Sequence, residues 1–153
     1  MSQPHSNPSH NFLDALRKLE YDKVVERISK LAYSESGRQQ ALHLTPQTDR
    51  TIIESELLKV SEAKELLIAE TAIPFDGFKN IVAALKKTAV ENQVLTVVEL
   101  LEIAATMRVS RSLKVFLAKR ASQYPTIGIY HQQLFADKIV EFHIFQIIVF
   151  KMK

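Results

Sequence analysis

Cysteine and tryptophan are absent from the sequence, and its 153 residues include only three glycines and five prolines. Without cysteine the chain has no disulfide framework, no thiol nucleophile and no thiolate ligand for zinc. The glycines, Gly37, Gly77 and Gly128, stand far apart and none precedes a lysine. This pattern excludes a nucleotide-binding P-loop in the chain, because such a loop needs two glycines bracketing four residues and a lysine after the second. No apolar run reaches the roughly 18 residues that span a membrane.

The remaining composition is that of an ordinary globular protein. Hydrophobic residues make up 46% and charged residues 24% of the chain, with a net charge of +3 and a pI of about 9.1. This charge is too small to indicate nucleic-acid binding by itself. The absence of cysteine fits a reducing compartment, and the first residues lack the features of a secretory signal or transit peptide. We therefore expect a cytoplasmic protein.

Apolar residues recur every three or four positions from Phe12 onward, and strand signals are scarce before the last ten residues. This periodicity predicts an all-α fold, an irregular bundle of about five to seven helices. Residues 1–11 are polar and contain two prolines, which predicts a disordered leader. The helical domain is expected over residues 12–143, and residues 144–153 form an apolar tail.

Local signals place the helices. Residues 13–31 predict one amphipathic helix or two short abutting helices. A longer helix follows, with Asp49 or Thr51 as its cap. Its single apolar face is expected to consist of Ile53, Leu57, Val60, Ala63 and Leu67. Further helices are expected to carry Phe78, Ile81, Val82 and Leu85, and to run from Asp137 through Phe142.

The clearest local signal is Thr96-Val97-Val98-Glu99, a capping box. The Thr96 side chain can accept from the Glu99 backbone, while the Glu99 carboxylate can reach back to the Thr96 N–H. No glycine or proline follows until Pro125, so the helix can run to about Arg120. Apolar residues on two of its sides predict that its first half is sandwiched between neighbouring helices.

A basic segment within residues 79–121 is the main electrostatic feature. Eight lysines and arginines stand against three glutamates there, a balance of +5. Arg108, Arg111 and Lys119 share roughly one side of the predicted helix and could lie along a phosphate backbone. The alternative is an ordinary solvated face, or a face covered by acidic neighbouring helices. Aromatic residues do not alternate with the basic ones, so single-strand stacking is not expected.

An acid–base or metal site is the weakest of the hypotheses. Asp137 and Glu141 are one helical turn apart and His143 follows, so the three could relay a proton in a stand-alone hydrolase. A solvated helix face explains them equally well. We expect no catalytic residue and no metal ligand in this chain.

The final residues differ from the rest, because Ile144 to Phe150 are almost wholly apolar and uncharged. Such a run belongs in a core or against a partner, since exposed it promotes aggregation. Either it packs back onto the helices, or the chain stops where its partner should begin.

An ordered series of short motifs resembles the amino-terminal region of the second bacterial MutS family, here called MutS-two. It covers roughly Leu13 to His143, and no single motif in it is diagnostic. The motifs are Leu19-Glu20-Tyr21-Asp22-Lys23, Ser34-Glu35-Ser36-Gly37, Leu44-Thr45-Pro46, Glu62-Ala63 with Leu66-Leu67, Pro74 with Gly77, Leu95 with Glu99-Leu100, Arg108, Leu113, Phe116-Leu117, and Tyr124-Pro125.

The resemblance implies a non-catalytic segment of the MutS core and lever. The intact family resembles a set of ATP-driven clamps that act on branched DNA or stalled ribosomes, in recombination control and ribosome rescue. Its ATP and magnesium site and its carboxy-terminal Smr endonuclease have no counterpart in this chain. The expected partners are the remaining MutS-like domains or a second subunit of a dimer, with DNA or ribosomal RNA as targets and no membrane.

Our first interpretation is therefore mechanical: the segment packs against the lever helices and relays ATP-driven motion to the clamp. The packing residues are expected to be Ile53, Leu57, Val60, Leu67, Leu100 and Met107. The alternative is a small stand-alone nucleic-acid-binding module that uses Arg108, Arg111 and Lys119.

Two departures from the family pattern stand out. Glu91-Asn92-Gln93 occupies the place where the family commonly has glycine, and Asn92 can supply the left-handed turn instead. After Glu141-Phe142-His143 the family continues with polar, charged residues, whereas this chain continues with the apolar tail. We interpret the tail as a truncated or frameshifted end, or as the non-native end of a fragment.

Overall fold

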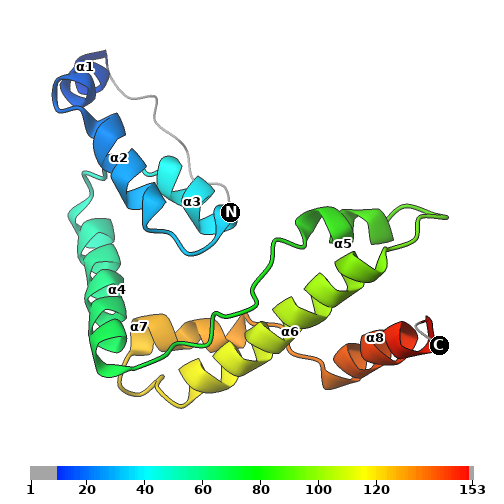
Figure 1. Cartoon of the computed structure of the whole chain (residues 1–153). Helices are drawn as coiled ribbons and strands as arrows, with labels where there is room; N and C mark the ends of the chain where they lie inside the picture. The colour runs from blue at the N-terminus through cyan, green and yellow to red at the C-terminus, as the bar shows by residue number, and fades with distance from the viewer. Residues whose placement is uncertain (1–9, 152–153) are drawn as a thin grey trace. The chain divides into compact units, whose positions relative to one another are not determined.

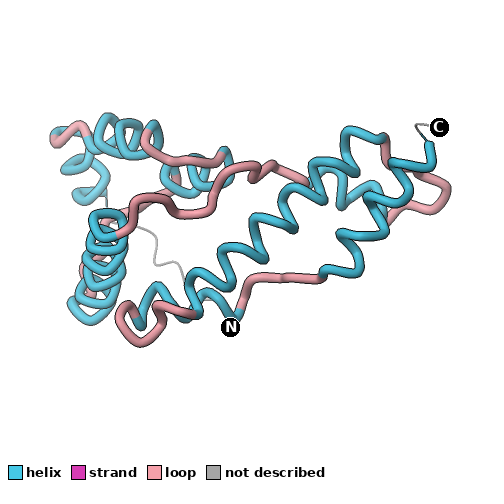
Figure 2. Tube along the Cα trace, turned by 60° about the horizontal axis from the view of Figure 1, so that its bottom comes forward, coloured by secondary structure: helices cyan, strands magenta, loops and turns pink. Residues whose placement is uncertain are grey.

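The computed structural model describes residues 10–151, which form two compact units, one up to Pro46 and one from Gln47 onward. The helices of the first unit are α1 (His10–Lys18), α2 (Tyr21–Lys30) and α3 (Glu35–Leu42). Those of the second are α4 (Arg50–Ala69), α5 (Val82–Thr88), α6 (Val97–Ala118), α7 (Pro125–Gly128), a 3₁₀ turn at Ile129–Gln132, and α8 (Lys138–Lys151). Figures 1 and 2 show helices joined by loops and no strand within the described residues. The all-α prediction is confirmed.

The structure has more helices than the expected five to seven, because residues 13–31 form two helices and a short helix lies where none was predicted. Residues 13–31 form two abutting helices, with Glu20 between them at a φ of 50°, in the left-handed region. A short helix also follows Tyr124, with Pro125 at its first turn. Proline is favoured there because it needs no hydrogen-bond acceptor for its nitrogen.

The first unit is built around α2, which packs against both α1 and α3. Val25 and Ser29 are its buried residues, whereas the apolar Val24 and Ile28 are 47% and 43% exposed. The Ser29 hydroxyl donates to the Glu26 carbonyl at 2.8 Å, which satisfies a polar group that would otherwise be costly to bury. The unit's interior is therefore small.

The second unit is organised around α6. Its first half packs between α5 and α8, where Ala84, Ile103, Ala104, Met107, Ile144 and Ile148 form one buried cluster. Its second half packs beside α7 and contributes Leu117 to a second cluster with Leu66 and Tyr124. The sandwiched first half that the sequence predicted is confirmed.

The apolar tail continues α8 as helix as far as Lys151. Ile144 and Ile148 within it are 7% and 6% exposed and belong to the α5–α6–α8 cluster. One side of the tail thus packs onto the bundle. Residues 1–9 of the predicted leader and residues 152–153 lie outside the described residues, and α1 begins at His10.

Candidate interaction surfaces on α4 and α6

The start of α6 is fixed by the capping box that the sequence predicted. Thr96 Oγ1 accepts from the Glu99 backbone N–H at 3.2 Å, and Glu99 Oε2 accepts from the Thr96 N–H at 2.8 Å. Glu99 also forms an ion pair with Lys87 of α5. The hydrogen bond from Lys87, followed by that from the Thr96 backbone, lowers the pKa of the Glu99 carboxyl from 4.5 to about 2. The carboxylate therefore stays ionised and ties α5 to α6.

The three basic residues proposed for nucleic-acid binding have different surroundings. Arg111 makes a bidentate contact with Glu141 of α8, with Nε and Nη2 donating at 3.0 and 3.1 Å to the two carboxylate oxygens. The Arg108 guanidinium lies over the Phe145 ring, 5.2 Å from its centroid. Lys119 caps the carboxyl end of α6, and it makes no ion pair within residues 10–151. Of the three, only Lys119 has neither an ion pair nor an aromatic contact among residues 10–151.

Other cations of the basic segment hold the fold together. Lys114 Nζ donates to the Leu134 carbonyl at 3.1 Å, after the 3₁₀ turn. Arg120 Nε donates to Glu70 at 2.6 Å, and its guanidinium lies over the Phe116 ring at 3.8 Å. The ion pair raises the pKa of Arg120 and lowers that of Glu70. Ion pairs within the chain therefore neutralise much of the net charge of +5 that this segment carries.

The apolar face expected on α4 is turned away from the interior. Glu62 and Leu66 are buried, at 7% and 4% exposed, whereas Leu57, Val60 and Leu67 are 59%, 63% and 65% exposed. Ile53 at the start of this stripe is half-buried. Successive helical residues are rotated by about 100°, which places the stripe opposite the buried pair. We call Ile53, Leu57, Val60 and Leu67 the outer stripe of α4.

The buried carboxylate of Glu62 caps α7. Its Oε2 accepts from the backbone N–H groups of Thr126 at 2.8 Å and Ile127 at 3.0 Å. These donors have no partner inside their own helix, because they lie in its first turn. The sequence analysis missed this role: the capping residue lies more than 60 positions away, and only the charge amid an apolar face could have suggested it.

The two packing residues expected on α6 lie inside the second unit. Met107 is 8% exposed within the α5–α6–α8 cluster, and Leu100 is partly buried against the same cluster. The proposed packing residues thus divide into an inner pair on α6 and the outer stripe of α4. Their role toward further domains remains a prediction.

The proposed acid–base trio has structural partners. Asp137 Oδ1 accepts from the Ile139 and Val140 N–H groups at 2.8 and 3.2 Å, which caps the start of α8. Glu141 accepts the two hydrogen bonds of the Arg111 ion pair, and the His143 ring makes an edge contact with the Phe142 ring. The three side chains are used separately and do not converge on a shared centre.

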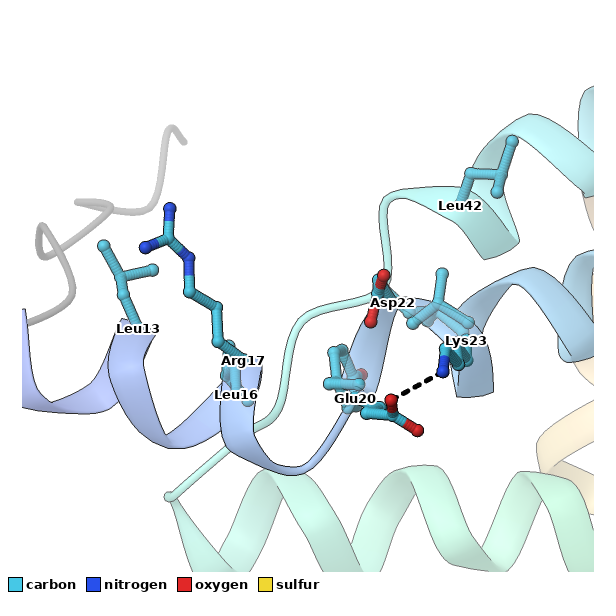
Figure 3. Close-up of a pocket in the computed structure, with 10 residues that line it drawn as sticks. Leu13, Leu16, Arg17, Glu20, Asp22, Lys23 and Leu42 are labelled. Carbon is cyan, nitrogen blue, oxygen red and sulfur yellow. Dashed lines mark hydrogen bonds and ion pairs between the residues drawn. The ribbon is translucent and has the colours of Figure 1, made fainter.

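A groove of about 610 Å³ lies in the first unit, between α1, α2 and the end of α3 (Figure 3). Leu13, Leu16 and Leu42 contribute apolar surface, and Glu20 binds Lys23 across three positions. Its wall also includes the Tyr21-Asp22-Lys23 step of the family resemblance.

None of the described helices is long and apolar enough to cross a membrane.

Comparison with known proteins identifies relatives named Endonuclease MutS2. The relative from Ruminiclostridium cellulolyticum is 34% identical over 101 residues, covering 66% of this chain and 13% of the relative. That from Pelotomaculum thermopropionicum is 33% identical over 113 residues, 74% of this chain and 14% of the relative. That from Geobacillus thermodenitrificans is 32% identical over 126 residues, 82% of this chain and 16% of the relative.

No protein-family model and no solved structure matches the chain. The chain spans only 13 to 16% of the length of the three relatives just described. Its matches nevertheless extend over most of its own residues and agree in name. The chain belongs to the MutS2 family and matches a short segment of the proteins in it.

Proposed function

We propose that the chain is a non-catalytic packing segment of a MutS2-like, ATP-driven clamp protein. In the proposal the clamp binds branched DNA or stalled ribosomes and acts in the cytoplasm as a dimer. ATP, magnesium and the endonuclease belong to parts of such a protein other than this chain. The segment transmits motion by packing against the lever helices.

The observation that carries the proposal is the outer stripe of α4. Four apolar residues lie on one side of a 20-residue helix whose opposite side is buried. They follow one another at intervals of four, three and seven positions, the spacing of a seam between helices. A contiguous exposed apolar surface of this kind marks an interaction site. An α-helix of a neighbouring domain fits that spacing.

The experiment is an exchange of segments. In the Geobacillus thermodenitrificans relative, the 126 matching residues are replaced by those of this chain. We expect the chimera to retain nuclease activity, and the chimera with Leu57→Glu and Leu67→Glu to lose it. The matched control is Glu54→Gln with Glu65→Gln, at exposed positions of α4 outside the stripe, which should leave activity unchanged. Full activity in the stripe variant would contradict the proposal.

The stand-alone nucleic-acid module is the second proposal, and it rests on the exposed cations Arg108 and Lys119. They are eleven positions apart, Arg108 within α6 and Lys119 at its carboxyl-end cap, hence on nearly the same side and roughly 16 Å apart along the axis. Binding carried by them should weaken steeply with salt, because phosphate contacts release counterions. Lys119→Glu and Arg108→Glu should abolish such binding to a branched DNA. Arg111→Glu is an unsuitable test, because it would place a second carboxylate against Glu141.

A further inference from the structure

The helix α8 is apolar on nearly all sides. Among its 14 residues only Lys138, Glu141 and Lys151 are charged. A helix of this composition is ordinarily buried all round, since a surface helix carries charged residues on its outer face. Here, however, α6 covers one side of α8, and Figures 1 and 2 show no helix of the second unit on its far side.

The two sides of α8 differ in environment rather than in composition. Glu141, Ile144 and Ile148 face the bundle and are each at most 7% exposed. The far side consists of Ile139, Val140, Phe142, Ile147 and Phe150, at 67%, 40%, 58%, 49% and 79% exposed. We call these five residues the outer face of α8. His143 and Gln146, both exposed, lie among them, and the face contains no lysine, arginine, aspartate or glutamate.

The apolar area of this face can be compared with the area that a dimer interface buries. The exposed fractions, with side-chain areas on the order of 150–200 Å² each, give roughly 500 Å² of apolar surface. Two copies pairing through it would bury roughly 1,000 Å², the area at which specific protein–protein interfaces begin.

We propose that the outer face of α8 is a homodimer interface, occupied by α8 of a second copy of the chain. A two-fold interface uses the same patch on both copies, so the patch must complement itself. A mostly apolar face whose polar residues are only His143 and Gln146 meets this condition, because it places no lysine, arginine, aspartate or glutamate opposite its own copy. It is less suited to a membrane surface, where an amphipathic helix needs basic residues on its other side, and that side is packed on α6.

The test is the mass of the full chain in solution by sedimentation equilibrium, over a wide range of protein concentration. We expect twice the 17.4 kDa of one chain, and a single chain mass for Ile139→Glu with Phe142→Glu. The matched control is Leu57→Glu with Leu67→Glu, which adds the same charge to another exposed apolar face and should leave the dimer intact. Circular dichroism confirms that each variant keeps its helices.

The absence of cysteine permits a second readout on the same protein. A single Gln146→Cys places a thiol in the middle of the outer face. A disulfide requires paired Cα atoms within about 7 Å, so the variant should form a disulfide-linked dimer under mild oxidation if two copies pair through this face. Ser61→Cys on exposed α4 should not. A monomeric wild-type chain, a dimer that survives the α8 substitutions, or a dimer lost in the α4 variant would each overturn the proposal. The outcome of these two measurements does not depend on the nuclease activity of the chimera, which tests the outer stripe of α4.

Discussion

Single residues far apart in the sequence fix how the segments of the second unit meet. Gly128 is buried where α7 approaches the loop after α6. A Cβ on it would lie 2.4 Å from the Cα and 2.9 Å from the Cβ of Ala121. No side chain fits there without movement of the backbone. The need for glycine therefore comes from close approach.

We predict that Gly128→Ala lowers the free energy of unfolding by about 1–3 kcal/mol, the usual cost of overpacking. Chemical denaturation followed by circular dichroism measures it. Gly37→Ala is the comparison, because its Cβ would meet side-chain atoms and no backbone, the Ser34 hydroxyl at 3.2 Å and the Ala32 Cβ at 3.7 Å, and alanine favours the helix. Equal losses in the two variants would show that crowding at Ala121 is not the cause.

Glu62 gives a second prediction at the residue scale. Glu62→Ala removes the acceptor of two first-turn N–H groups of α7 and should lower the free energy of unfolding by about 1–3 kcal/mol. Glu65→Ala, on the exposed side of the same helix, should change it by less than about 0.5 kcal/mol. Denaturation of both variants decides, and a Glu62→Ala chain as stable as the Glu65→Ala chain would refute the capping role.

At the scale of elements, the residues that cap helices and form turns could be predicted, whereas the helix face that is buried could not. The capping box at Thr96 follows from neighbouring residues alone, and the left-handed Asn92, with a φ of 65°, was expected where the resembled family has glycine. At α4, Asp49 was correctly among the two expected caps, and it accepts from the Thr51 and Ile52 N–H groups. The helix nevertheless buries Glu62 and Leu66 rather than its most regular apolar stripe. Which face is covered depends on distant partners, here the α7 backbone and Leu117.

Two other elements show the same limit. The helix predicted to carry Phe78 begins only at Val82, where Asn80 Oδ1 accepts from the Val82 N–H at 3.2 Å. The apolar residues before it are held in a loop, and the Lys79 N–H donates to Thr106 Oγ1 of α6 at 3.2 Å. In α8, the uniform hydrophobicity gave no periodicity from which to choose between a helix and a strand.

The Glu99 carboxyl predicts how the α5–α6 contact responds to pH. Its pKa lies at about 2 in the folded chain and near 4.5 when unfolded, so its ionised form stabilises the fold. That stability is fully present above about pH 4.5 and is lost as the pH falls toward 2. The melting temperature of the wild-type chain should exceed that of Glu99→Gln at pH 5, and the difference should shrink as the pH approaches 2. A difference independent of pH would contradict the assignment.

The ion pair between Arg111 and Glu141 predicts how α8 is held. Arg111→Gln leaves the buried Glu141 carboxylate without its cation, and an unpaired buried charge is costly. We expect a clear fall in melting temperature and faster proteolysis before α8. Lys119→Gln removes the same charge from an unpaired, exposed side chain and should leave both properties unchanged. Equal behaviour of the two variants would mean that the pair does not hold α8.

At the scale of the whole molecule, the sequence predicted the all-α class and the MutS2 resemblance. The class follows from periodicity throughout the chain, and the resemblance from many weak matches in order. The division into two units was not foreseen, because apolar spacing continues on both sides of Pro46. The mechanical role remains our proposal, and it requires that the outer stripe of α4 be covered in a longer MutS2 protein.

Thiol labelling measures that covering most directly, since the chain has no cysteine of its own. Val60→Cys in the outer stripe and Glu65→Cys on the exposed flank are labelled with a maleimide, in this chain and in the chimera freed of other cysteines. We predict that Val60→Cys reacts quickly in the chain and at least tenfold more slowly in the chimera, while Glu65→Cys reacts quickly in both. Equal rates for Val60→Cys in the two proteins would show that nothing covers the stripe, and would contradict the packing role.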